Sequence, residues 1–122
     1  MTKKVLVIDD DPDVSITLSL RLQSFGYEIE SAKDGKEGLG KVKYFKPDLI
    51  FLDYFMPGQS GIEVLKQLKS DPEETIKNIP VMMLTGNEDA EKESLSNGAA
   101  GYITKPFDLF QLKEVLSKFF PK

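Results

Sequence analysis

The stretch "LVIDDDPDV" (residues 6–14) carries an apolar run directly into three aspartates, which are followed by a proline. Apolar runs without alternation are typical of central strands in a parallel sheet, because helices bury such strands on both faces. Asp11 before Pro12 is a common helix start, with aspartate as the N-cap and proline at the first helical position. One cap needs only one aspartate, so Asp9 and Asp10 require a different explanation.

Four further segments have the patterns of strands. "LIFL" (49–52) and "VMML" (81–84) are apolar runs like residues 5–8. "YEIES" (27–31) alternates polar and apolar residues, as an edge strand with one wet face does. "GYIT" (101–104) is short and lies between a glycine and a Lys-Pro pair. We therefore predict five strands.

Helical periodicity fills the segments between these strands. We predict one helix that ends near Gly26, one that follows Asp34, and others over residues 61–70, over residues 88–97 and from Asp108 onward. The predicted core-facing residues, in chain order, are Val14, Leu18, Leu22 and Phe25; Ile62, Leu65 and Leu68; Ala90 and Leu95; Leu109, Leu112, Leu116 and Phe119. The helix over 88–97 has the fewest apolar anchors, so we expect it to be loosely attached.

The helix after Asp34 carries conflicting signals. Asp34 and Glu37 have the spacing of a capping box. Gly38 and Gly40 lie inside the helix, where each should cost about 1 kcal/mol relative to alanine. We expect this helix to be the least stable.

Strands that alternate with helices predict a doubly wound α/β domain, since right-handed crossovers bury a parallel sheet between two helical layers. The edge character of residues 27–31 favours the strand order 2-1-3-4-5. The length of 122 residues suits a single domain over residues 1–122.

Composition excludes several kinds of chemistry. The chain has no cysteine and no histidine, so disulfides, Cys/His zinc sites, cysteine nucleophiles and Ser-His triads are ruled out. The formal net charge of -4 argues against direct binding of nucleic acid, which requires a basic surface. The N-terminal apolar run is too short for a signal peptide or a membrane span, so we expect a cytoplasmic protein that does not bind membranes.

Polar residues follow the central strands. Ligands of open parallel sheets bind beyond the carboxyl ends of the strands, where the strand order reverses. In this order the reversal lies between residues 5–8 and residues 49–52. The residues that the strands deliver to this edge are Asp9, Asp10, Asp53, Thr85 and Lys105.

Each of these residues also has a purely structural interpretation. Asp53 could begin the turn in "DYFMPG", Thr85 with Gly86 could belong to an ordinary turn, and Lys105 could be a solvated charge. Their joint placement at one edge of the sheet favours a functional site.

Three adjacent carboxylates cannot all stay ionised cheaply unless a proton or a divalent cation neutralises them. Mg²⁺ prefers oxygen ligands of this kind. A carboxylate in such a site can act as a nucleophile toward phosphorus, and the Lys105 ammonium and the Thr85 hydroxyl could stabilise the transferred phosphoryl group. The cluster therefore predicts that an aspartate accepts a phosphoryl group.

Four stretches together resemble the receiver domain of two-component response regulators, which is CheY-like: "VLVIDDDPDV", "PDLIFLDYFMPGQSGIEVL", "IPVMMLTG" and "GAAGYITKPF". The resemblance covers essentially all 122 residues. It implies a flavodoxin-like (βα)5 fold, for which the order 2-1-3-4-5 is already known.

The resemblance also implies roles for residues at the acidic edge. Asp53 would be the phosphoacceptor and a metal ligand. Asp10 would bind Mg²⁺ directly, and Asp9 would act on the metal largely through water. The backbone carbonyl of Phe55 would complete the protein ligands. Phe55 is bulkier than many residues at its position in the family, so we expect it to shield the acyl phosphate from water.

Further residues would bind the phosphoryl group and respond to it. Thr85, Gly86 and Lys105 would contact the phosphoryl group, and the Lys105–Pro106 bond is typically cis in this family. Thr85 and Tyr102 would be the switch residues, with an exposed aromatic on a short edge strand as the structural alternative for Tyr102.

As a member of that family, the protein would accept its phosphoryl group from a sensor histidine kinase or a phosphotransfer protein. It would act as a signalling domain and not as an enzyme, apart from its own phosphotransfer and autodephosphorylation. The surface formed by residues 88–97, 101–104 and the last helix would then signal to a downstream protein or an output domain, or form a phosphorylation-dependent dimer.

Three alternatives compete with this interpretation. A flavodoxin-like flavin protein shares the architecture, but "DDDPD" would repel a flavin phosphate. A phosphatase of the haloacid dehalogenase type typically has an aspartate two residues after its nucleophile, where this chain has Phe55. A receiver-fold interaction module that is never phosphorylated in the cell stays open.

Overall fold

The computed structural model describes residues 2–121, in which five parallel strands form one sheet. The strands are β1 (Lys4–Ile8), β2 (Glu28–Ala32), β3 (Leu49–Asp53), β4 (Val81–Thr85) and β5 (Gly101–Thr104). Their order is β2-β1-β3-β4-β5, so β1 and β3 are neighbours at the point where the order reverses. The predicted fold class and strand order are confirmed.

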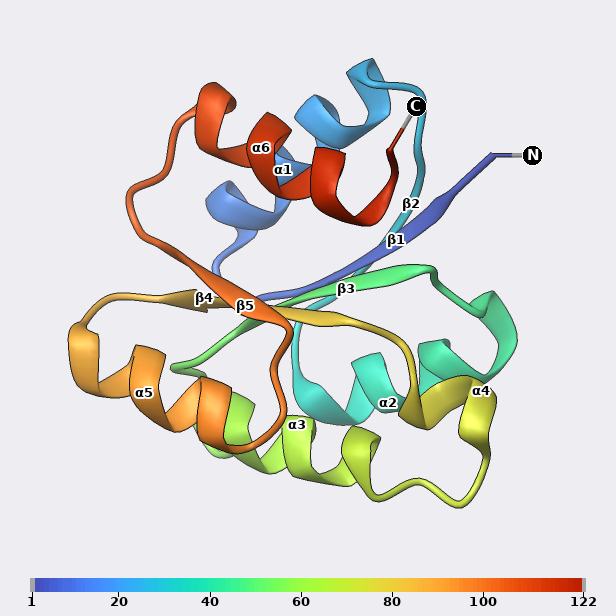
Figure 1. The fold of residues 1–122 in the computed structure, drawn as a ribbon, viewed down its shortest axis with the longest axis vertical. Helices are drawn as coiled ribbons and strands as arrows, with labels where there is room; N and C mark the ends of the chain where they lie inside the picture. The colour runs from blue at the N-terminus through green and yellow to red at the C-terminus, as the bar shows by residue number, and fades with distance from the viewer. Residues whose placement is uncertain (1, 122) are drawn as a thin grey trace.

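Helices cover both faces of the sheet. They are α1 (Pro12–Ser24), α2 (Gly35–Phe45), α3 (Gly61–Lys69), α4 (Glu74–Lys77), α5 (Glu88–Ser96) and α6 (Leu109–Phe119). Figure 1 shows α1 and α6 together on one face and the other four helices on the opposite face. Right-handed crossovers between parallel strands produce this two-layer covering.

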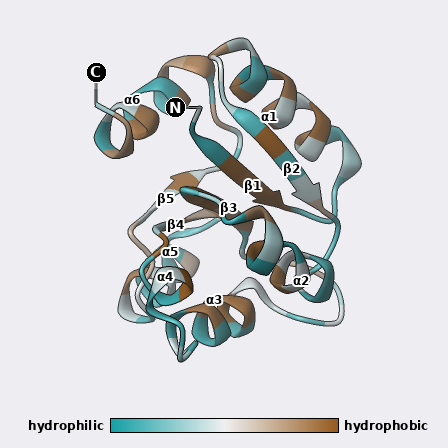
Figure 2. Cartoon of the chain, turned by 90° about the vertical axis from the view of Figure 1, so that its right-hand side faces the viewer, coloured by the Kyte–Doolittle hydropathy of each residue, from teal (hydrophilic) through white to brown (hydrophobic). Residues whose placement is uncertain are grey.

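Burial on both faces explains why the central strands are continuously apolar. In β1, Leu6 and Ile8 belong to the core beneath α2 and α3, whereas Val5 and Val7 belong to the core beneath α1 and α6. All four side chains are inaccessible to solvent. Figure 2 shows the hydrophobic colour along β1, with helices that carry both colours because only one side of each faces the sheet.

The structure corrects the predicted number of helices. The short helix α4 lies between α3 and β4 and makes a sixth helix, where five were predicted. Its only buried side chain is that of Ile76. A helix of four residues is too short to show a periodic apolar pattern, which is why the sequence did not reveal it.

The apolar face predicted for α5 is also corrected. Leu95 was expected to anchor this helix, but its side chain is 49% exposed. Ala90 and Ser94 are buried instead. Residues four positions apart share a helix face, and Leu95 lies one residue beyond that face. Leu109 of α6 is likewise exposed, so the buried stripe of α6 consists of Leu112 and Leu116.

Helix α2 begins almost as predicted. The Asp34 carboxylate accepts a hydrogen bond from the Glu37 backbone N–H at 2.8 Å, as an N-cap does. The Glu37 carboxylate, however, accepts from the Lys33 N–H at 3.1 Å and not from Asp34. The predicted capping box is therefore only half formed.

The two interior glycines of α2, Gly38 and Gly40, have different surroundings. A Cβ on Gly38 would lie 2.5 Å from Ile8 Cδ1, so glycine allows α2 to approach β1 closely. A Cβ on Gly40 would meet nothing within 4 Å. Of these two residues, only Gly38 therefore has a packing function. Across residues 2–121 we find no helix with the length and apolar character that a membrane span requires.

Candidate functional site

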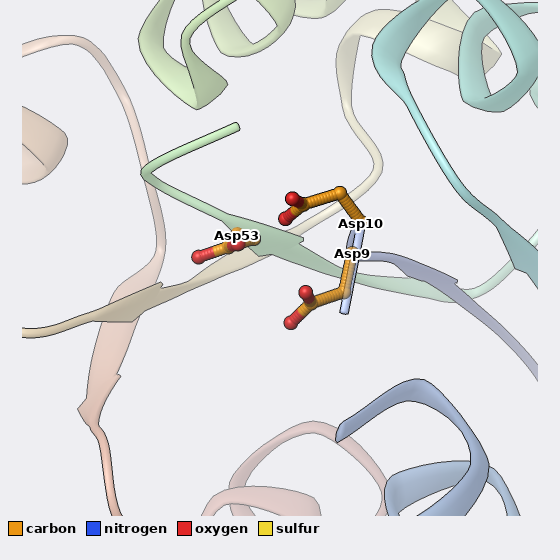
Figure 3. Close-up of side chains that lie close together, drawn as sticks. All are labelled: Asp9, Asp10 and Asp53. Carbon is orange, nitrogen blue, oxygen red and sulfur yellow. The ribbon is translucent and has the colours of Figure 1, made fainter. Parts of the chain in front are cut away.

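Three carboxylates meet where β1 and β3 end side by side. Asp9 and Asp10 follow β1, and Asp53 is the last residue of β3. One oxygen from each carboxylate lies within 4.8 Å of the others. Figure 3 shows Asp10 and Asp53 extending toward the same space, with Asp9 beside them. Asp9 and Asp53 are buried and Asp10 is exposed, so the cluster is closed on one side and open to solvent on the other.

The three consecutive aspartates have different local contacts. The Asp9 N–H donates to the Ala32 carbonyl at 3.0 Å, which continues the pairing of β1 with β2. Asp9 Oδ1 accepts from the Asp11 N–H at 2.9 Å. Asp11 Oδ1 in turn accepts from the Asp13 N–H at 2.9 Å. The predicted N-cap role of Asp11 is confirmed, and Asp9 and Asp10 are left for the acidic cluster.

Lys105 is the cation that faces this cluster. Its Nζ donates to Asp9 Oδ2 at 3.1 Å and to Asp53 Oδ1 at 3.2 Å. The backbone N–H of Lys105 donates to the Thr85 carbonyl at 2.7 Å, which fixes the start of this loop against β4. The Lys105–Pro106 bond is cis, as expected.

Burial and neighbouring charge shift the pKa of Asp53 upward to about 6. Desolvation is the larger cause and repulsion from Asp9 the second, while Lys105 opposes both. Desolvation alone would lower the pKa of Lys105, but its hydrogen bond with Asp9 and the two carboxylate charges outweigh that effect and raise it. Lys105 therefore stays a cation, and one ammonium does not fully compensate the buried carboxylates.

The donor set of the cluster fits a magnesium ion. All three side chains offer carboxylate oxygen, the ligand that Mg²⁺ prefers. The exposed side of Asp10 leaves room for the waters that Mg²⁺ retains. The excess of negative charge over Lys105 would be reduced by a divalent cation.

A pocket of about 400 Å³ opens beside Asp53. It is lined by Asp53, Tyr54, Phe55, Leu84, Thr85, Gly86, Asn87 and Lys105. The residues predicted to contact a phosphoryl group thus lie around one hollow. The Phe55 side chain is 80% exposed at its rim, and its backbone N–H donates to Asp53 Oδ1 at 3.4 Å.

The two predicted switch residues have different environments. Thr85 is only 1% exposed and lies in the pocket beside Asp53. Tyr102 is 39% exposed and lines a separate hollow with Leu95 and Lys92 of α5. In this arrangement Tyr102 is an outward-facing aromatic on β5, and its role as a switch stays a prediction.

Sequence reasoning missed four residues whose contacts join α5 to the site: Glu91, Thr104, Tyr54 and Glu93. The Glu91 carboxylate accepts hydrogen bonds from Thr85 and Thr104. The Tyr54 hydroxyl, next to Asp53, donates to Glu93, and this bond raises the pKa of Tyr54. Acidic residues in a helix resemble solvated charges in the sequence, so no local pattern could have revealed these contacts.

The model of the response regulator receiver domain family matches residues 5–117. Sporulation initiation phosphotransferase F of Bacillus subtilis is 35% identical over 123 residues, which cover 99% of this chain and 96% of that protein. The phosphate regulon transcriptional regulatory protein PhoB of Pseudomonas aeruginosa is 38% identical and covers 95% of this chain. The chain spans about half the length of PhoB and of the other transcriptional regulators it matches first.

Solved structures agree with the family match. The chemotaxis protein CheY4 of Vibrio cholerae superposes with a TM-score of 0.90 at 33% identity, covering 98% of this chain and 99% of its own. A putative response regulator from Chloroflexus aurantiacus reaches a TM-score of 0.92 at 30% identity and covers both chains fully. The chain belongs to the response regulator receiver domain family.

Proposed function

We propose that Asp53 accepts a phosphoryl group from a histidine of a sensor kinase or phosphotransfer protein, in a reaction that depends on Mg²⁺. The observation that carries this proposal is the meeting of Asp9, Asp10 and Asp53 within 4.8 Å, opposite the ammonium of Lys105. The name of the B. subtilis relative, a phosphotransferase of similar length, supports phosphoryl transfer.

The Asp53 carboxylate would be the nucleophile. One of its oxygens forms a bond to phosphorus while the bond from phosphorus to the donor imidazole breaks, and the imidazole nitrogen keeps the electron pair. This step needs the ionised carboxylate. Without metal the pKa of Asp53 is about 6, so its carboxylate is mostly ionised at pH 7, and a bound Mg²⁺ ion would favour the ionised form further.

Lys105 and Thr85 would stabilise the charge on the phosphoryl oxygens. Lys105 already donates to Asp53, so its ammonium lies within reach of a group attached there. Thr85 and Gly86 line the same pocket and would supply a hydroxyl and a backbone N–H.

Asp9, Asp10, Asp53 and the carbonyl of Phe55 would hold the Mg²⁺ ion. When bound, the ion supplies positive charge that neutralises the carboxylates and the incoming phosphoryl oxygens. Asp10 is the exposed member of the cluster, so it gives the ion access from solvent.

The phosphoryl group would change the surface formed by α5, β5 and α6 by a population shift involving Thr85 and Tyr102. This surface exposes several large apolar side chains: Leu95, Tyr102, Leu109 and Phe110. Such residues are suited to contact a partner protein or to form a phosphorylation-dependent dimer. The transcriptional regulators among the relatives are about twice as long as this chain, which supports an output domain as one target. The signalling would take place in the cytoplasm.

The test is the intact mass of the protein after incubation with acetyl phosphate and MgCl₂. The native protein should gain one phosphoryl group, and Asp53→Asn should gain none. Omitting Mg²⁺ should abolish the gain. Asp48→Asn, an exposed aspartate just before β3, is the matched control and should be phosphorylated like the native protein. An equal gain in Asp53→Asn would refute the proposal.

A further inference from the structure

A single carboxylate of α5 connects the two threonines that end β4 and β5. Thr85 and Thr104 are neighbours in the register of these strands. Glu91 Oε2 accepts a hydrogen bond from Thr104 Oγ1 at 2.6 Å and a longer one from Thr85 Oγ1 at 3.5 Å. Figure 1 shows α5 in the layer that covers this end of the sheet. We call the three-residue contact the Glu91 bridge.

The Glu91 bridge offers the Thr85 hydroxyl an acceptor on α5. A hydroxyl has only one proton to donate, and Glu91 Oε2 lies within reach of it at 3.5 Å, a long hydrogen bond. Within residues 2–121 this is the single hydrogen bond that the Thr85 side chain makes. Because Thr85 is 1% exposed, bulk water does not offer the hydroxyl an easy alternative acceptor.

A phosphoryl oxygen on Asp53 would need the same proton. Thr85 lines the pocket beside Asp53, so its hydroxyl can serve either Glu91 or an anion in the pocket but not both at once. The short bond to Thr104 holds the Glu91 carboxylate in place beside Thr85. Glu91 is thus placed to compete with the phosphoryl group for one donor.

We propose that Glu91 is a positioning residue that holds the Thr85 hydroxyl away from Asp53 in the unphosphorylated protein and thereby weakens binding of a phosphoryl group. This inference rests on the proposed function of Asp53. Phosphorylation then requires that the Thr85–Glu91 contact break, which links the chemistry at Asp53 to α5 through one hydrogen bond. The free energy needed to break the Thr85–Glu91 contact contributes to the equilibrium between the unphosphorylated and phosphorylated conformations.

The test uses beryllium fluoride, a mimic of the phosphoryl group, titrated with excess fluoride and Mg²⁺ and followed by NMR. Glu91→Ala should increase the apparent affinity about two- to tenfold, the range that corresponds to the net contribution of one hydrogen bond. Glu91→Gln keeps the shape and a weaker acceptor, so it should give a smaller increase. Without ligand, the Thr85 signals of Glu91→Ala should move toward their positions in the ligand-bound native protein.

A charge effect is separated from the hydrogen bond by two controls. Glu88→Ala removes the same charge from the same helix, where Glu88 pairs with the exposed Lys92, and it should leave the affinity unchanged. In a Thr85→Val background, Glu91→Ala should not change the affinity for beryllium fluoride, because the hydroxyl for which Glu91 and the ligand compete is absent. An effect that persists in that background, or native affinity in Glu91→Ala, would overturn the role of Glu91. Failure of the native protein to bind would instead overturn the proposed function.

Discussion

Lys105 Nζ lies 3.1 Å from Asp9 Oδ2, although 96 positions separate the two residues in the chain. The contact joins the loop after β5 to the end of β1, and Asp53 of β3 shares the same ammonium. Asp9 is almost completely buried, so its charge has little access to solvent. Lys105 is therefore expected to contribute to the stability of the unphosphorylated protein as well as to its chemistry.

Replacing Lys105 with methionine should lower the free energy of unfolding at pH 7 by about 1 to 3 kcal/mol, since two buried carboxylates lose their charged partner. Mg²⁺ should restore part of the loss because it would supply the missing positive charge. Urea denaturation with and without MgCl₂ measures both effects. Lys92→Met, which removes an exposed pair with Glu88, should change stability by less than about 0.5 kcal/mol. Equal effects of the two substitutions would contradict the prediction.

The raised pKa of Asp53 predicts how stability depends on pH without metal. Its pKa is about 6 in the folded protein and 3.8 in its ordinary state, so between about pH 4 and 6 the folded protein binds more protons than the unfolded chain. The free energy of unfolding should therefore fall as pH rises through this interval. Asp53→Asn removes the titrating carboxyl group and with it this dependence on pH. The variant should be more stable than the native protein by about 2 to 3 kcal/mol above pH 6, with almost no difference below pH 4.

Urea denaturation of both proteins at pH 4, 5, 6 and 7 in the presence of a chelator measures the difference. Asp89→Asn, an exposed substitution on α5, serves as the control and should show no comparable trend. A constant difference in the free energy of unfolding between Asp53→Asn and the native protein over this range would show that the pKa of Asp53 is not raised in the folded protein.

The two interior glycines of α2, Gly38 and Gly40, should respond in opposite directions to replacement by alanine. Gly38→Ala brings a methyl group into Ile8 and should destabilise the protein by about 1 to 3 kcal/mol. Gly40→Ala meets no neighbour, so the higher helix propensity of alanine should stabilise the protein by up to about 1 kcal/mol. Thermal and urea unfolding of this matched pair provide the test, and a stabilising Gly38→Ala would show that α2 can move away from β1 at little cost.

Phe55 should lengthen the life of the proposed phosphoryl group by limiting access of water to the pocket. Phe55→Asn should speed loss of the phosphoryl group on the order of fivefold, which corresponds to about 1 kcal/mol in the activation barrier. Intact-mass measurements at intervals after removal of acetyl phosphate give the rate. Phe110→Asn removes a similarly exposed phenylalanine on α6, outside the pocket, and should leave the rate unchanged. No increase in Phe55→Asn would refute the shielding role.

The fold was largely predictable because strands that are buried on both faces of a sheet are apolar at every position. The runs at residues 5–8, 49–52 and 81–84 are apolar without interruption, and each forms a central strand. The meeting of Asp9, Asp53 and Lys105 was also predictable, since parallel strands bring their carboxyl ends to one edge.

Other features depend on tertiary contacts that a local pattern does not encode. Leu95 is more hydrophobic than Ser94, yet the serine is buried because it shares the inner face of α5 with Ala90. The buried Ser94 hydroxyl donates a hydrogen bond to the Ala90 carbonyl at 2.7 Å, so it is not left without a partner. In the sequence, Glu91 resembles an ordinary acidic residue near the start of a helix. Its hydrogen bonds with Thr85 and Thr104 depend on the tertiary packing of α5 beside β4 and β5.

Gly61 gives the two sides of Asp53 different freedom to move. A Cβ at this position would lie 2.1 Å from the Asp53 carbonyl oxygen, so α3 begins directly against the backbone of the proposed phosphoacceptor. Helix α5, in contrast, reaches the site through side-chain hydrogen bonds of Glu91 and Glu93, which can exchange partners without moving a strand. A rearrangement that followed the proposed phosphorylation of Asp53 would therefore be blocked by backbone toward α3 and could be accommodated by side-chain contacts toward α5.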